Sequence, residues 1–254
     1  MHFPVEIGIG NYRLSAHLVL ETLAFMVGYR YFLYLRKKSR DTLADDHRVQ
    51  LLIAATFGAF FGSRISGSLE DPAGLVRSAH RFLYLFSHKS IIGGLLGGLL
   101  SVEVTKKLLG VTRSSGDLMT YPLVLALIIG RIGCFSSGVY EDTYGSVTAF
   151  FTGMDLGDAR LRHPVVLYEI AFLLLLWLGL SRWEKKVNFR DGVRFRLFMT
   201  CYLLFRFGVE FLKPRTPALA GLGTLQMFCL AGLFYYRRTL FQLCFRPAQL
   251  LEHA

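Results

Sequence analysis

The sequence lacks any polar stretch long enough to fold as a separate soluble module, and only 19% of its 254 residues are charged. It shows no internal repeat and no low-complexity segment, and it lacks the paired Gly/Pro-interrupted helices typical of inverted-repeat transporters. Cysteine is scarce, and Cys134, Cys201, Cys229 and Cys244 have neither the spacing of a disulfide framework nor that of a metal site. We therefore expect buried structural thiols, no metal and no cofactor.

Apolar residues, by contrast, are abundant: 53% of the chain is hydrophobic and the mean hydropathy is +0.41. A helix needs about 20 residues to cross the hydrocarbon core. Seven apolar runs come close to that length: 16–35, 49–68, 90–109, 119–138, 164–183, 194–213 and 219–238. Because backbone groups in lipid must be satisfied internally, each run is predicted to be a helix. The sequence thus predicts an all-α integral membrane protein in which residues 1–254 form a single polytopic domain.

The net charge of +11 would suit a nucleic-acid-binding protein, but its distribution favours a topology signal. Seventeen basic residues flank the run ends that would share one side of the membrane, against eight on the other side. The positive-inside rule then places the N-terminus outside and the C-terminus in the cytoplasm. Residues 69–89 and 139–163 become external loops, and the second is a candidate lid. Because this distribution explains the excess charge, we expect no nucleic-acid partner. The segment before the first run lacks a basic region and a small-residue cleavage site, so we expect that run to be retained.

Several apolar runs contain charged side chains, which are costly in lipid. A charge at the bilayer centre costs at least about 2.5–3.5 kcal/mol, so a chain keeps several only where they face one another, water or an anionic ligand. The predicted topology places Glu103 and Arg30 in the inner half of their runs, as structural charges, and the others in the outer half. This indicates one functional site near the external face, containing Arg64, Arg131, Glu169, Arg206 and Glu210.

Glycines flank Arg131 in the segment 130–138, which ends the fourth run. Glycines let a neighbouring helix or a lipid headgroup approach the backbone. One interpretation is an arginine that snorkels to the interface, but Arg131 lies just beyond the middle of the run, which favours function. The small-residue spacing at Gly58 and Gly62, and within 93–98, is typical of close helix packing, with a lipid headgroup against the backbone as the alternative.

The fifth run opens with the segment His163-Pro-Val-Val-Leu-Tyr-Glu169. His163 suits either a solvated cap or a general base near neutral pH. Tyr168 suits either an interfacial aromatic or a donor to a phosphate ester. Arg206 and Glu210 are four residues apart on one helix face. They suit either a simple intrahelical ion pair or an arginine that its glutamate orients toward an anion.

Together the segments 130–138, 163–169 and 206–213 resemble the prolipoprotein diacylglyceryl transferase family, over roughly the second to the seventh run. The resemblance implies a seven-helix enzyme of the bacterial cytoplasmic (inner) membrane, with an external N-terminus and an active site toward the outer leaflet. It implies transfer of a diacylglyceryl group from phosphatidylglycerol to a lipobox cysteine of an exported prolipoprotein, with release of glycerol phosphate. Arg131 and Arg206 match the family's two essential arginines and would hold the donor phosphate.

Two positions depart from the family pattern. Ile92 stands where family members usually carry a histidine, and Cys134 replaces a common asparagine. His163 or Glu169 could then serve as the base, and two alternatives stay open: a lipid-modifying enzyme of the same fold with another acceptor, and a non-enzymatic anion- or lipid-binding transporter. The candidate catalytic residues are Arg131, Arg206 and His163, and the candidate substrate-binding residues are Arg64, Gly138, Tyr168, Glu169 and Glu210.

Overall fold

The computed structural model describes residues 3–10, 12–39, 43–214 and 221–251, and most of them are helical. An apolar chain in lipid satisfies its backbone N–H and C=O groups within each helix, which explains the helical content. Several of the helices are long and apolar enough to cross a membrane, so the prediction of a helical, multi-pass membrane protein is confirmed. The helices fall into two compact units, each described by itself here, and the single domain stays a prediction.

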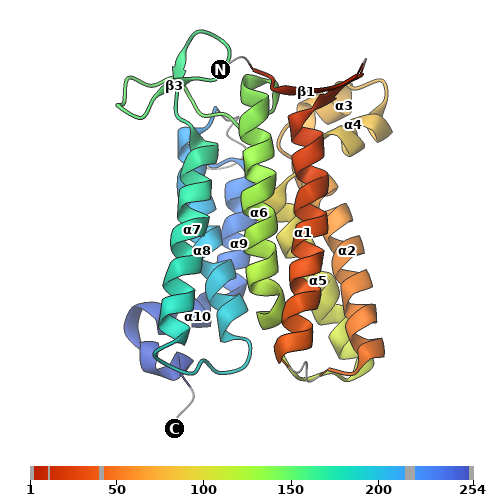
Figure 1. Cartoon of the computed structure of the whole chain (residues 1–254), viewed down its shortest axis with the longest axis vertical. Coiled ribbons are helices and arrows are strands. Elements are labelled where there is room, and N and C mark those ends of the chain that lie inside the picture. Colours follow the sequence, from red (N-terminus) through yellow and green to blue (C-terminus); the bar gives the residue numbers. More distant parts are fainter. Residues whose placement is uncertain (1–2, 11, 40–42, 215–220, 252–254) are drawn as a thin grey trace. The chain divides into compact units, whose positions relative to one another are not determined.

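Unit 1 contains the described residues of 1–40, 116–214 and 246–254. Within it α1 packs along α6, which also contacts α7 and α8 (Figure 1). The core between these helices buries large apolar side chains completely, among them Val124, Leu173, Phe198 and Leu203. The elements of unit 1 are β1 (Glu6–Ile9), β2 (Tyr12–Ser15), α1 (Ala16–Ser39), α6 (Asp117–Ser137), η1 (Gly138–Tyr140), β3 (Met154–Asp155), β4 (Leu161–Arg162), α7 (Val165–Glu184), α8 (Val193–Val209), η2 (Glu210–Leu212) and η3 (Pro247–Leu250).

Two short hairpins lie at the same end of unit 1 (Figure 1). The antiparallel pair β1–β2 leads directly into α1, and the Val5 N–H donates to the Ser136 carbonyl at 2.8 Å, which ties the hairpin to the end of α6. The pair β3–β4 lies inside the loop 139–163. Its turn is held by Asp155, whose Oδ1 accepts from three successive backbone N–H groups, the common behaviour of an aspartate in a turn.

The opposite end of α6 is joined to the start of α8 by Asp117. Its carboxylate accepts from the N–H of Gly192 at 2.6 Å and from the N–H of Phe195 at 2.9 Å, so it satisfies N-terminal donors of α8. Nearby, the Tyr121 hydroxyl donates to Glu184 at 2.8 Å. These contacts link α6, α7 and α8 to one another at the end away from the hairpins.

Unit 2 contains the described residues of 41–115 and 215–245. Its largest contact joins α2 and α5, where glycines of one helix face glycines of the other. A Cβ atom on Gly62 would lie 2.9 Å from the Cα atom of Gly97, so the two backbones nearly touch. The interpretation of these glycines as close helix packing is confirmed. The helices of unit 2 are α2 (Asp45–Ser68), α3 (Pro72–Arg77), α4 (Arg81–Ser87), α5 (Ile91–Leu109), α9 (Thr224–Tyr235) and α10 (Arg237–Phe245).

The close contact between α2 and α5 makes a first prediction. Gly62→Ala is expected to destabilise the protein by about 1–3 kcal/mol, because its new methyl group meets backbone atoms that cannot move aside. Gly94→Ala is the matched control on the same interface. Its Cβ atom would lie 3.5 Å from the nearest atom, an ordinary contact, and alanine is the better helix former by about 1 kcal/mol. Thermal unfolding in detergent compares the two variants, and equal midpoints would contradict the packing argument.

The predicted spans are recovered in part. The helices α1, α2, α7 and the stretch Asp117–Tyr140 are long and apolar enough to cross a membrane, and α4 with α5 makes a further candidate that bends by 93°. The predicted run 194–213 is an α-helix only to Val209 and then continues as the 3-10 helix η2, and the run 219–238 breaks between α9 and α10. Its first two residues, 219 and 220, lie outside the described residues. The number of seven spans and the orientation of the termini therefore stay predictions.

The predicted loop 69–89 is itself largely helical, because it contains α3 and α4. Asp71 starts α3 by accepting from the Gly74 N–H at 3.0 Å, and Pro72 fits the first helical turn. The linker to α5 crosses α2 at Gly67, where a Cβ atom would lie only 2.7 Å from the backbone nitrogen of Lys89. This close crossing accompanies the bend before α5.

None of the four cysteines, which all lie among the described residues, forms a disulfide, and their burial differs. Cys134 and Cys229 are buried and Cys201 is half-buried, but Cys244 on α10 is exposed. The expectation of buried thiols is therefore wrong for Cys244. Its helix buries only Thr239, so most of α10 lies outside the packed core.

Candidate functional site

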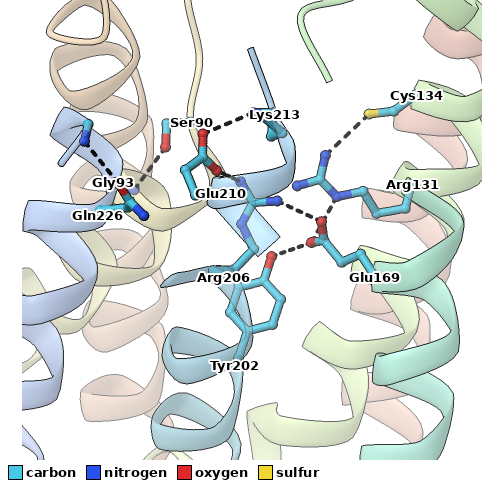
Figure 2. A network of polar contacts seen from close by, with 11 residues as sticks. Ser90, Gly93, Arg131, Cys134, Glu169, Tyr202, Arg206, Glu210, Lys213 and Gln226 are labelled. Carbon is cyan, nitrogen blue, oxygen red and sulfur yellow. Dashed lines mark hydrogen bonds and ion pairs between the residues drawn. The ribbon is translucent and has the colours of Figure 1, made fainter. Parts of the chain in front are cut away.

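The centre of the candidate site is Glu169, which is only 1% exposed in the second turn of α7. Its Oε1 lies 2.9 Å from Nε of Arg131, and its Oε2 accepts from Nη1 of Arg206 at 2.8 Å (Figure 2). The Tyr202 hydroxyl donates to Oε1 at 2.5 Å. One carboxylate from α7 thus joins an arginine of α6 to an arginine of α8.

A second carboxylate extends this network on α8 and η2. Arg206 donates through Nη2 to Glu210 at 3.2 Å, and Lys213 donates to the other oxygen of Glu210 at 3.4 Å. The predicted pair between Arg206 and Glu210 is therefore present, but Arg206 also reaches Glu169 on another helix. Arg206 is held from two sides, which fixes the direction of its guanidinium.

The network carries an excess of positive charge in a buried place. Arg131 is 5% exposed and Arg206 is 6% exposed, and three cations face two carboxylates. Within the described residues, Nε of Arg206 is buried and has no hydrogen-bond partner. Buried charge is expensive unless it is compensated. The arrangement can therefore accept one further anion, and a guanidinium fork fits phosphate oxygens well.

Tyr202 is a member of the network that the sequence analysis did not identify. It is completely buried, and its ring stacks on Phe198 while its hydroxyl orients Glu169. A signal was available, because Tyr202 lies four residues before Arg206 and so shares its helix face. An aromatic residue in an apolar run usually packs in the core, so nothing else in the sequence indicated the hydrogen bond to Glu169.

His163 and Tyr168 form a second, separate group at the start of α7. Nδ1 of His163 lies 3.2 Å from the Tyr168 hydroxyl, which also bonds to Thr152 in the loop 139–163. Across residues 43–214, neither side chain makes a hydrogen bond or ion pair with Arg131 or Arg206. The structure therefore does not join His163 and Tyr168 to the arginine network, and their predicted roles stay predictions.

The two other predicted site residues have different surroundings. Arg64 belongs to α2 of unit 2, where it donates to the Phe86 carbonyl and its guanidinium lies 5.5 Å from the centre of the Phe60 ring. Gly138 ends α6 with a φ of +59°, and a Cβ atom there would lie 2.8 Å from Cγ of Phe3. A side chain at position 138 would be both strained and crowded. For Gly138 the structure thus gives a conformational role, and substrate binding by either residue stays a prediction.

Comparison with known proteins adds independent findings. A family described as "Prolipoprotein diacylglyceryl transferase" matches residues 4–239. The chain is 28% identical to the phosphatidylglycerol–prolipoprotein diacylglyceryl transferase of Clostridium tetani, over 81% of this chain and 82% of that protein. It is 24% identical to the protein of the same name from Rickettsia canadensis over 83% of both chains, and 28% identical to that from Wolbachia pipientis wMel over 76% of both.

Proposed function

The chain belongs to the prolipoprotein diacylglyceryl transferase family, and we propose that it transfers a diacylglyceryl group from phosphatidylglycerol to a lipobox cysteine of a prolipoprotein. The names of its relatives support both the donor and the acceptor class. In this reaction the cysteine thiolate attacks the glycerol carbon that carries the phosphate ester. The new S–C bond replaces the C–O bond, whose electron pair leaves with glycerol phosphate, and the thiol proton passes to water.

One observation carries the mechanism: two buried arginines from α6 and α8 meet on Glu169. The donor phosphodiester has one negative charge, and it gains a second when the C–O bond breaks. Guanidinium donors that are already oriented stabilise this new charge without reorganising, which is commonly the largest contribution to catalysis. In this proposal Arg131 and Arg206 bind the phosphate, while Glu169, Glu210 and Tyr202 position them.

The remaining site residues and the topology belong to the same proposal. His163 and Tyr168 lie at the N-terminal end of α7, beside the loop 139–163, where an acceptor peptide would approach. Gly138 would shape the donor site at the end of α6, and Arg64 of unit 2 stays a separate candidate for lipid binding. The basic residues favour seven spans in a single domain, an external N-terminus and a cytoplasmic C-terminus. The site then faces the outer leaflet of the bacterial inner membrane, which an exported prolipoprotein reaches.

The proposed function is tested with the purified protein, phosphatidylglycerol vesicles and a peptide that contains a lipobox cysteine. We expect mass spectrometry to detect a peptide that is heavier by one diacylglyceryl group, together with released glycerol phosphate. A peptide with serine in place of the cysteine is the control, because a hydroxyl is a far poorer nucleophile than a thiolate. Lipid consumption without a thioether product would instead favour another acceptor, and no lipid consumption at all would contradict the proposal.

A further inference from the structure

A second polar cluster in unit 1 adjoins the network around Glu169, which it meets through the contact between Arg131 and Cys134. It consists of His17 on α1, Cys134 on α6 and Glu141, which follows η1. One imidazole nitrogen, the thiol sulfur and one carboxylate oxygen all lie within 4.8 Å of one another. Atoms bound to one tetrahedral zinc ion at about 2.0–2.3 Å lie about 3.3–3.8 Å apart, so side-chain rotations that shorten the distances by up to about 1.5 Å would bring all three into one coordination sphere.

The backbone brings these residues together through two glycines. Gly133 lets α6 approach α1, because a Cβ atom there would lie 3.2 Å from Cβ of Leu20 and 3.3 Å from the His17 carbonyl. Gly138 then turns the chain at the end of α6 with its positive φ, so that Glu141 comes back toward Cys134. The cluster is therefore built from segments far apart in the sequence, and spacing between cysteines and histidines along the chain cannot indicate it.

His17 has the surroundings that are typical of a metal-binding histidine. Its side chain is 14% exposed, and its ring lies buried between two carboxylates and the Cys134 thiol. Glu141 lies 3.5 Å from Nδ1, and Glu21 lies 3.5 Å from Nε2, on the other side of the ring. A histidine that binds a metal through one nitrogen usually donates its other N–H to a carboxylate. Nδ1 would then face the metal, and Glu21 would orient the ring.

We propose that His17, Cys134 and Glu141 bind a zinc ion, and that the open fourth position of this ion binds the thiolate of the acceptor cysteine. Nitrogen, sulfur and carboxylate oxygen are the ligands that zinc prefers, and catalytic zinc sites combine three protein ligands with one open position. This inference rests on the proposed function and deepens it. The acceptor cysteine would bind at this cluster, while the donor phosphate would bind at the arginine network.

The position of the cluster suits the chemistry. Nη1 of Arg131 lies 3.8 Å from Sγ of Cys134, so the proposed acceptor site adjoins the proposed phosphate site. Glu169 already contacts two arginines and Tyr202, so it is poorly placed to remove a proton from a thiol. A thiol that coordinates zinc is deprotonated outright, with its proton released to water. The thiolate held there would attack the glycerol carbon, and glycerol phosphate would leave with the C–O electron pair toward Arg131 and Arg206.

Cobalt(II) replaces zinc as a spectroscopic probe of this site. The metal-free protein in detergent is expected to bind one cobalt ion per chain and to develop a sulfur-to-cobalt charge-transfer band. Cys134→Ser should abolish the band, while Cys229→Ser and Cys244→Ser are matched controls that should keep it. Glu21→Gln should weaken cobalt binding by about 10–100-fold, the usual effect of losing a carboxylate that orients a metal ligand. No band in the wild type, or an unchanged band in Cys134→Ser, would mean that His17 is only an imidazolium between carboxylates.

The open position is tested on the wild-type protein, so the result does not depend on whether a variant folds. Adding the lipobox peptide without any lipid should strengthen the charge-transfer band, because a second thiolate joins the metal, whereas the serine peptide should not. Metal removal then separates the two proposals. Undiminished transfer by the metal-free enzyme would overturn the zinc site and leave the transferase function intact. A peptide-responsive metal site in a protein that transfers nothing would overturn the function alone.

Discussion

Replacing Arg131 or Arg206 by alanine is expected to lower the rate of diacylglyceryl transfer by at least about 10²–10³-fold, the usual cost of losing one preorganised donor to a developing charge. Each arginine is nearly inaccessible to solvent, so no water molecule can readily take over its role. Transfer is measured as thioether product formed from phosphatidylglycerol and the lipobox peptide. Because the loss concerns the phosphate, binding of the peptide to the protein should change little.

Lysine variants separate charge from geometry at these positions. Arg131→Lys and Arg206→Lys keep the positive charge but lose the planar fork that can bind two phosphate oxygens, so we expect them to stay strongly impaired. Arg194→Lys is the matched control, because Arg194 also pairs with a glutamate on α7 but lies at the other end of α8. Normal transfer in both alanine variants would contradict the arginine–phosphate mechanism. Equal losses in Arg194→Lys and Arg206→Lys would point to a general effect on α8.

Replacing Glu169 by alanine is expected to cost about 3–5 kcal/mol of stability, as is typical when one partner of a buried ion pair is removed. The variant leaves Arg131 and Arg206 facing each other inside the protein without the carboxylate that they share. It also leaves the buried hydroxyl of Tyr202 without its acceptor. The midpoint of unfolding in detergent should therefore fall markedly. Glu169→Gln should lie between alanine and the wild type, because it keeps the shape and an acceptor oxygen but not the charge.

Glu103→Gln is the control for this prediction. Glu103 pairs with Lys106 at 3.3 Å on α5, but its side chain is 38% exposed, so losing its charge should change stability by no more than about 1 kcal/mol. Phosphatidylglycerol provides a further test, because a bound phosphate could compensate the arginines that Glu169→Gln leaves unbalanced. We expect this lipid to stabilise Glu169→Gln more than it stabilises the wild type. If Glu103→Gln lowers the midpoint of unfolding as much as Glu169→Ala does, the shared carboxylate is not what stabilises the two arginines.

The helices were the most predictable part of the fold. Long apolar runs indicated α1, α2, α6 and α7, because a chain in lipid must satisfy its backbone within each segment. The bend between α4 and α5 was not predictable in this way. It accompanies the close passage of the linker at Gly67 on another helix, a tertiary contact that hydropathy does not indicate. The small helices α3 and α4 were missed for a different reason, because segments of that length carry too weak a periodic signal.

The sequence indicated some residues of the candidate site but missed Tyr202, and it did not indicate most of the connections between them. The spacing of Arg206 and Glu210 indicated their ion pair, because residues four apart share a helix face. No spacing indicates that Glu169 is shared between Arg131 and Arg206, since that contact depends on the mutual rotation of three helices. His163 was predicted as a candidate general base, and its contact with the Tyr168 hydroxyl at 3.2 Å was not indicated by its place in the chain.

The sequence alone determined that the chain is a helical membrane protein and which costly charges it keeps within apolar segments, because both follow from local hydropathy and composition. It also carried the motifs that indicate the family. Only the tertiary structure decided that one carboxylate joins the two arginines, and that His17, Cys134 and Glu141 meet beside them. Contacts of this kind depend on how closely glycines let helices approach and on how each helix is rotated, and these are properties of packing rather than of any single segment.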